Sequence, residues 1–130
     1  MVLTFVDTTV FVYAVGREHP LREPAQTMLR ERLDRNVPMA TSAEVLQELL
    51  HVYLPVGRGS TLDAALRLAR DLTVIWSVDA DDALAARDLA VSEPGLGARE
   101  LLHLALCRRH GVDEVLTFDR ALRAAFARAG

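Results

Sequence analysis

Cysteine is nearly missing from this sequence, in which only Cys107 among 130 residues carries a thiol. A single thiol excludes an internal disulfide, and it cannot supply the thiolate cluster of a structural zinc site. A reducing compartment, the cytoplasm, is the simplest setting for such a chain.

Long apolar runs are missing as well. No segment reaches the roughly 18 uninterrupted apolar residues of a membrane span. The N-terminal stretch MVLTFVD carries an acid where a signal peptide would carry basic residues. We therefore expect a soluble protein that is neither exported nor held in a membrane.

Lysine is absent and aromatic residues make up only 5% of the chain. All 15 basic residues are Arg, whose forked guanidinium suits phosphate oxygens, but few aromatic rings are available to stack on single-stranded bases. The net charge of −3 argues against non-specific coating of nucleic acid. An RNA substrate is not excluded, because without the four acids described below the balance is 15 basic against 14 acidic residues.

Short apolar runs alternate with longer amphipathic ones along the whole chain. This pattern predicts an α/β protein with a parallel sheet, formed as one domain over residues 1–130. Thr41 or Ser42 is expected to cap one helix, and Ser60 or Thr61 the next. The predicted strands are 2–6, 38–41, 74–78 and 114–118, and the predicted helices are 10–15, 20–35, 42–54, 60–72, 79–90, 98–110 and 121–129.

Acidic residues stand where strands end or where helices leave the same edge of the sheet. Asp7 and Asp119 follow strands, whereas Glu44 and Glu100 lie in the first turns of helices. Ligands of open α/β sheets bind at the edge formed by the carboxyl ends of the strands. Converging carboxylates need a cation to offset their repulsion, and oxygen ligands without cysteine favour Mg²⁺ or Mn²⁺.

Each of these acids also has a structural interpretation. Asp7 and Asp119 could cap the helices that follow them, while Glu44 and Glu100 could interact with helix dipoles. A second acidic group at Asp79, Asp81 and Asp82 is better explained by capping of its own helix. The convergence of the first four acids on one edge favours a functional site over four separate caps.

Four segments, FVDTTVFVYA, TSAEVLQELLHV, LGARELLHLALCRRHGV and EVLTFDRAL, together resemble the PIN domain, and especially the VapC-type toxin ribonucleases of bacterial toxin–antitoxin pairs. The resemblance implies a three-layer fold with a central parallel sheet of about four strands. It also implies a metal-dependent endoribonuclease, a homodimer and a VapB-like antitoxin partner. By position, the four acids that bind Mg²⁺ or Mn²⁺ and cut RNA would be Asp7, Glu44, Glu100 and Asp119.

The resemblance extends to residues around these acids. Thr8 and Thr117 match hydroxyl residues expected to orient metal ligands or water, and His103 is expected to pack near the site without acting as a base. Arg99 and Arg120, each beside a candidate acid, are candidates for phosphate contacts. The third acid of the family is usually Asp, so Glu100 is a departure.

Two alternatives compete with the nuclease interpretation. A phosphoacceptor enzyme or receiver domain also places acids at strand ends, but Thr9 stands where a second Asp would be needed and no Lys is present. The other is a catalytically weak PIN-fold module that binds RNA or protein, which the departure at Glu100 leaves open.

Overall fold

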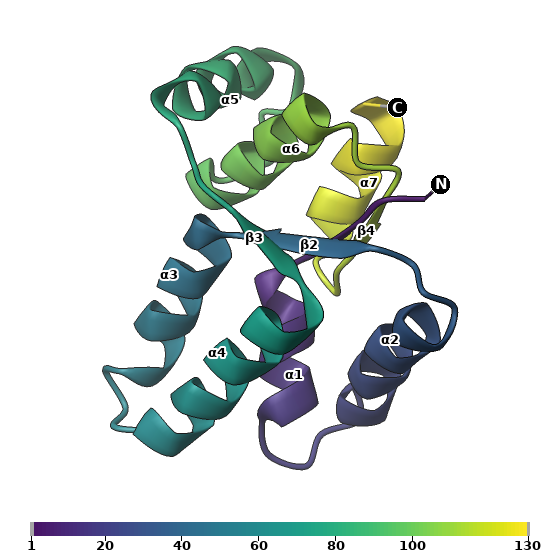
Figure 1. Cartoon of the computed structure of the whole chain (residues 1–130). Helices are drawn as coiled ribbons and strands as arrows, with labels where there is room; N and C mark the ends of the chain where they lie inside the picture. The colour runs from purple at the N-terminus through teal and green to yellow at the C-terminus, as the bar shows by residue number, and fades with distance from the viewer. Residues whose placement is uncertain (1, 130) are drawn as a thin grey trace.

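A computed structural model describes residues 2–129, which form a parallel sheet between two groups of helices (Figure 1). The predicted order of elements is confirmed, although three of the four strands are shorter than predicted and the strand predicted at 38–41 begins and ends one residue later. The strands are β1 (Thr4–Val6), β2 (Met39–Ser42), β3 (Val74–Trp76) and β4 (Glu114–Leu116). The helices are α1 (Thr8–Val15), α2 (Arg22–Asp34), α3 (Ala43–Tyr53), α4 (Gly59–Leu72), α5 (Ala80–Ser92), α6 (Ala98–His110) and α7 (Arg120–Ala129).

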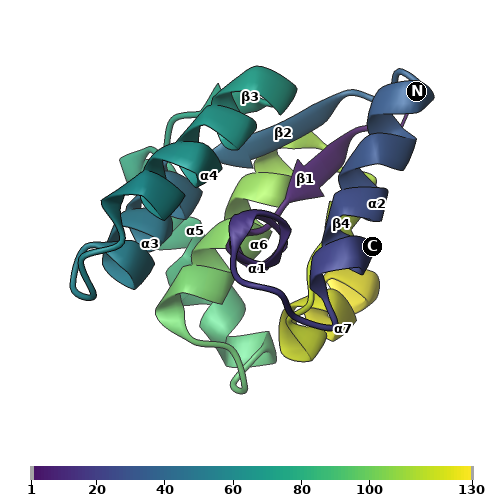
Figure 2. The same ribbon diagram turned by 90° about the horizontal axis from the view of Figure 1, so that it is seen from below.

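The sheet has the strand order β3-β2-β1-β4, and each neighbouring pair is parallel. Every residue of β1 is buried because helices cover both of its faces, which explains why the apolar residues Phe5 and Val6 follow each other without alternation. Helices α1 to α4 lie on one side of the sheet and α5 to α7 on the other (Figures 1 and 2). The predicted three-layer architecture is therefore confirmed.

The main core joins the sheet to both helical layers. Phe5 and Val6 of β1 are fully buried and share one cluster with Phe11 of α1, Leu49 of α3 and Leu106 of α6. A smaller cluster lies between α5, α6 and α7. Within residues 2–129 no helix combines the length and hydropathy needed to cross a bilayer.

The N-termini of α3, α4 and α5 differ in how they are capped. Ser42 caps α3, since its hydroxyl oxygen accepts a hydrogen bond from the Val45 amide at 3.3 Å. The predicted cap of α4 at Ser60 or Thr61 is wrong, because this helix already begins at Gly59 and Arg58 occupies the cap position. The acids before α5 do form a cap, in which the Asp79 amide donates to Asp82.

The cap of α3 predicts a matched pair of mutational effects. Ser42→Ala should lower the free energy of unfolding by about 1 kcal/mol, because a buried helix-end amide loses its acceptor. Ser60→Ala removes the same hydroxyl from an exposed helical position and should change stability by less than about 0.5 kcal/mol. Urea unfolding followed by circular dichroism measures both; equal effects would contradict the assignment of Ser42 as the cap.

Candidate active site

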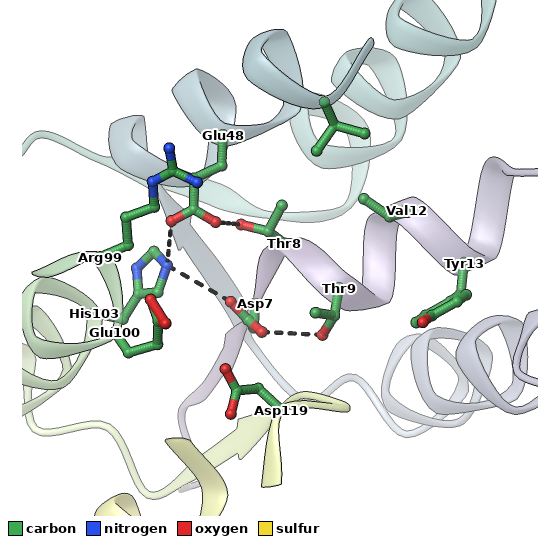
Figure 3. Close-up of a pocket in the computed structure, with 11 residues that line it drawn as sticks. Asp7, Thr8, Thr9, Val12, Tyr13, Glu48, Arg99, Glu100, His103 and Asp119 are labelled. Carbon is green, nitrogen blue, oxygen red and sulfur yellow. Dashed lines mark hydrogen bonds and ion pairs between the residues drawn. The ribbon is translucent and has the colours of Figure 1, made fainter. Parts of the chain in front are cut away.

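A pocket of about 340 Å³ opens at the edge of the sheet where the strands end. Its walls come from α1, α3, α6 and the segment between β4 and α7 (Figure 3). Four carboxylates and one imidazole face this space. The lining residues are Asp7, Thr8, Thr9, Val12, Tyr13, Glu48, Val52, Arg99, Glu100, His103 and Asp119.

Asp7 is held by hydroxyl groups from both ends of the chain. It occupies the cap position of α1, yet its side chain makes no capping hydrogen bond. Its Oδ2 accepts from the Thr117 hydroxyl at 2.6 Å and from the Thr9 hydroxyl at 3.0 Å. The capping interpretation of Asp7 is therefore wrong.

The two hydroxyls have fixed directions because each also accepts a backbone hydrogen bond. The Asp119 amide donates to Thr117 at 2.9 Å, and the Phe118 amide donates to Thr9 at 3.0 Å. A hydroxyl has only one proton to donate, and here it is directed at the carboxylate. Oδ2 of Asp7 is thereby immobilised, and Oδ1 is left on the side of the carboxylate that approaches His103.

Glu48 on α3 is the second buried carboxylate of the pocket. Its Oε2 accepts from the Thr8 hydroxyl at 2.5 Å, and its Oε1 lies 2.9 Å from Nε2 of His103. The same nitrogen lies 3.6 Å from Oδ1 of Asp7. Neither contact has the direction of a hydrogen bond, so Oε1 of Glu48 and both ring nitrogens of His103 lack an aligned partner among the described residues.

Burial and charge act against each other in this group. Burial opposes ionisation of Glu48, but the neighbouring His103 imidazole and Thr8 hydroxyl outweigh it and lower the pKa of the carboxyl. Burial likewise opposes a charge on His103, while Glu48 and Asp7 raise its pKa. Each group thus favours the charged form of the other.

The structure places Glu48, and not Glu44, in this pocket. Both lie on α3, but Glu44 is in the first turn, and four residues of helix move a side chain about 6 Å along the axis. The pocket contacts α3 at Glu48 and Val52, opposite Thr8 and Val12 of α1. Placing the second acid at Glu44 is therefore one helical turn too early.

Glu100 and Asp119 line the pocket as the sequence predicted. Glu100 is half-buried in the first turn of α6. Asp119 is also half-buried, and its Oδ1 accepts from the Leu122 amide at 3.0 Å, so it caps α7 as well. Figure 3 shows its carboxylate directed toward Asp7. Asp119 can therefore cap α7 and line the pocket at the same time.

The two arginines beside these acids differ in position. Arg99 is exposed and lines the pocket, and its positive charge contributes to lowering the pKa of Glu48. Arg120 is exposed but is not among the lining residues. Of the two, Arg99 has the better position to contact a ligand in the pocket.

The donor set fits a divalent cation. One potential ligand atom from each of Asp7, Glu48 and His103 lies within 4.8 Å of the others. The buried Oε1 of Glu48 has no aligned donor within residues 2–129, and an orphaned carboxylate oxygen of this kind is suited to binding a cation. Carboxylate oxygens dominate the pocket, which favours a hard ion such as Mg²⁺ or Mn²⁺.

Comparison with known proteins identifies the family of this chain. The family model of the PIN domain matches residues 4–127. Ribonuclease VapC23 of Mycobacterium tuberculosis is 57% identical over 124 residues, which cover 95% of this chain and 98% of the relative. The chain belongs to the PIN domain family, and within it to the VapC ribonucleases.

Other members and solved structures extend the comparison. Ribonuclease VapC13 of M. tuberculosis is 31% identical over 122 residues, 91% of each chain. The crystal structure of VapC20 from the same organism, a sarcin-ricin loop cleaving toxin, aligns with a TM-score of 0.76 over 94% of both chains at 21% identity. VapBC2 of Rickettsia felis, solved with a fragment of promoter DNA, aligns with a TM-score of 0.69 over 94% of this chain and 92% of the other at 16% identity. These structural likenesses show the shared fold.

One sequence signal could have identified Glu48 in this PIN domain. Its neighbours on the helix, Val45 and Leu49, are fully buried, so Glu48 interrupts the apolar stripe of α3. Charged residues are rarely buried unless they are paired or bind a ligand. An acid inside an apolar helical stripe is thus a stronger candidate than an acid in the first turn.

Glu48 lines the pocket and Glu44 does not, so variants of these two residues should respond differently to metal. Mn²⁺ at a hundredfold excess over its dissociation constant should stabilise the wild type by about 2.7 kcal/mol. Glu48→Gln and Asp7→Asn should lose most of this stabilisation, whereas Glu44→Gln should keep it. Thermal unfolding across a Mn²⁺ titration, with free Mn²⁺ followed by electron paramagnetic resonance, measures both stability and binding.

Glu44→Gln is the matched control because it removes the same charge from the same helix. Loss of Mn²⁺ binding in Glu44→Gln together with retention in Glu48→Gln would contradict the site as described. A wild type whose melting temperature ignores both Mn²⁺ and Mg²⁺ would also contradict it.

Proposed function

We propose that this chain is a Mg²⁺- or Mn²⁺-dependent endoribonuclease that works as a single PIN domain over residues 1–130 and serves as the toxin of a VapBC-type pair. The observation that carries the proposal is the pocket in which Asp7, Glu48, Glu100 and Asp119 face one another. The identity to VapC ribonucleases over nearly the whole chain supports it.

The pocket residues have distinct tasks in this proposal. Asp7 and Glu48 would hold the cation from two elements, with Glu100 and Asp119 completing the carboxylate set directly or through water. A bound divalent ion lowers the pKa of water and offsets negative charge on the phosphate. Thr8, Thr9 and Thr117 keep the carboxylates oriented through the hydrogen bonds described above.

Substrate phosphates would meet positive charge at the rim of the pocket. Arg99 is exposed beside Glu48 and can present its guanidinium to a phosphate oxygen. Arg120 lies outside the pocket lining and would contact the RNA further along its backbone. Hydrolysis by activated water would leave 5′ phosphate and 3′ hydroxyl ends.

His103 is buried, and its ring lies between two carboxylates. That position does not suit a base that removes a proton from a ribose hydroxyl, because such a base must reach the substrate directly. We assign His103 the task of positioning Glu48. The proposed reaction is therefore hydrolytic and not a cyclisation through the 2′ hydroxyl.

A catalytically weak binding module is the second candidate function. The observation that favours it is Glu100, which stands where the third acid of the family is usually Asp. The longer glutamate side chain has more rotamers to immobilise, so its carboxylate is held less firmly. The two functions differ in whether metal-dependent cleavage can be measured.

Cleavage should depend on the pocket acids. Asp7→Asn and Asp119→Asn should lower RNA cleavage by more than about 100-fold, since changing residues that merely support metal ligands already costs 10- to 100-fold. Asn is chosen at position 119 because it retains the cap of α7. Single-turnover cleavage of structured RNA with and without EDTA measures the effect, and growth arrest on expression provides a second readout.

Variants of Glu100 test its part in the carboxylate set, and metal-dependent cleavage by the wild type separates the two candidate functions. Glu100→Gln should slow cleavage at subsaturating Mn²⁺, whereas Glu100→Asp should keep or raise the rate. Equal rates for wild type and Glu100→Gln would show that Glu100 is only a helix-end charge. Full activity of Asp7→Asn and Asp119→Asn, or no metal-dependent cleavage by the wild type, would contradict the nuclease proposal.

We also propose that the protein pairs with itself and with a VapB-like antitoxin. Large apolar side chains are exposed on α2, on α3 and in the segment after α3, at Leu33, Leu50, Val52, Leu54 and Val56. An apolar hollow between α2 and α4, lined by Leu29, Leu33, Leu68 and Leu72 among others, adds to this surface. Such surface favours protein partners, and an Arg from the antitoxin could pair with the pocket carboxylates.

Partner binding should appear in two measurements. Light scattering should show a dimer of the isolated protein at high micromolar concentration, and the product of a gene immediately upstream should form a tighter complex without nuclease activity. Leu33→Glu places a charge on the exposed apolar surface and should weaken self-association. A monomer that the upstream product does not inhibit would contradict the partner proposal and leave the nuclease proposal standing.

A further inference from the structure

A second hollow continues from the carboxylate pocket along α1 and α3. The two share Val12, Tyr13 and Val52 as a common wall. The second hollow has a volume of about 390 Å³ and extends to the segments that follow these two helices. Its lining residues are Val12, Tyr13, Gly16, Arg17, Glu18, His19, Val52, Tyr53, Val56 and Arg58.

Aromatic rings meet at this junction although they are scarce in the chain. The ring of Tyr13 lies with its centroid 4.7 Å from that of His19, with a tilt of 34°. Phe118 meets Tyr13 edge-on, with centroids 5.4 Å apart and an interplanar angle of 88°. Tyr13 is thus held between a ring from the β4–α7 segment and a ring from the α1–α2 segment.

The orientation of His19 is fixed by the backbone. Its Nδ1 accepts a hydrogen bond from the Leu21 amide at 3.0 Å, and the residue as a whole is exposed. A ring fixed in this way loses little side-chain entropy when a ligand stacks on it. Tyr13 and His19 therefore form a preformed aromatic platform beside the carboxylate pocket.

Charge on the hollow suits an anionic polymer. Arg17 is exposed, Arg58 is half-buried, and Glu18 is the one acid in the lining. Apolar side chains such as Val52 and Val56 form the rest of the wall. Single-stranded nucleic acid is bound by this combination of basic groups for the phosphates and aromatic faces for the bases.

We infer that the Tyr13–His19 platform is a nucleotide subsite in which a base adjacent to the cut phosphodiester stacks, while Arg17 and Arg58 contact the next phosphates. Six residues of helix separate Tyr13 from Asp7, or about 9 Å along the axis of α1, a distance that a neighbouring nucleotide can span. This inference rests on the proposed ribonuclease function, because it assigns the single-stranded part of the RNA to a place in the same groove.

The subsite can be measured without cleavage. The probe is a 12-nucleotide single-stranded RNA of mixed sequence that contains one 2-aminopurine, titrated with the full-length protein in Ca²⁺ and checked by gel to remain intact. Stacking on the platform should quench the 2-aminopurine fluorescence at one or two positions of the label. His19→Ala should abolish the quenching and weaken binding by at least about fivefold, the lower end of the effect of a stacked base.

Four further variants test the aromatic ring, an unrelated histidine and the two proposed phosphate contacts. Tyr13→Phe keeps the ring and should retain the quenching. His51→Ala changes an exposed histidine on α3 that lines neither hollow, so it should leave binding and quenching unchanged. Arg17→Gln and Arg58→Gln should each reduce the slope of log affinity against log salt by about 0.7, as expected for one phosphate contact on a single strand.

Cleavage kinetics provide an independent readout. His19→Ala should raise KM by the same factor as the dissociation constant and leave kcat near the wild-type value. If the wild type cleaves RNA but His19→Ala changes neither KM nor quenching, the subsite is wrong and the ribonuclease proposal stands. If the wild type neither binds the probe nor cleaves RNA, both are wrong.

One result would show that the second hollow binds a protein partner and not RNA. If His19→Ala leaves RNA binding intact but weakens inhibition by the upstream gene product, the hollow binds a peptide and the nucleotide subsite is overturned. Loss of both RNA binding and quenching in His19→Ala, with His51→Ala unchanged, supports the subsite.

Discussion

Repulsion between carboxylates that share one pocket is the constraint on which the rest of this structure depends. Asp7 and Glu48 are buried, and Glu100 and Asp119 face the same space. Like charges at such short range disfavour ionisation unless neighbouring groups compensate. The compensation here comes from hydroxyl donors, from the imidazole of His103 and from Arg99 at the rim, while the carboxylate oxygen without an aligned donor is suited to a cation.

These compensating contacts also connect elements that are distant in sequence. Thr117 joins the end of β4 to Asp7 after β1, Thr8 joins α1 to α3, and His103 brings α6 against both carboxylates. The buried hydrogen bonds of Thr117 and Thr8 favour one arrangement of the surrounding elements. The carboxylate pocket is therefore part of the structural centre of the molecule, and mutations in it are expected to affect stability as well as function.

Polarity changes along the groove that begins at this pocket. The end at the sheet is acidic, the shared wall of Val12, Tyr13 and Val52 is apolar and aromatic, and the far end carries Arg17 and Arg58. A metal-dependent nuclease needs both ends, because carboxylates hold the cation while basic and aromatic groups hold the substrate. The proposed antitoxin would compete for the same groove, so inhibition and substrate binding would involve overlapping residues.

The sequence by itself determined the order of the elements, the parallel sheet and the edge at which the acids meet. Local signals were enough for the order of elements: apolar runs alternate along the chain, and Gly111 ends α6 with a φ of +67°. The edge follows because the carboxyl ends of parallel strands must lie together. Asp7, Glu100 and Asp119 could be placed at the pocket for that reason. Only the tertiary structure decided that Glu48 lines the pocket in place of Glu44, because the depth of the pocket along α3 depends on how α1 and α6 pack against it. The same is true of the Tyr13–His19 platform, since ring contacts between segments leave no periodic trace in the sequence.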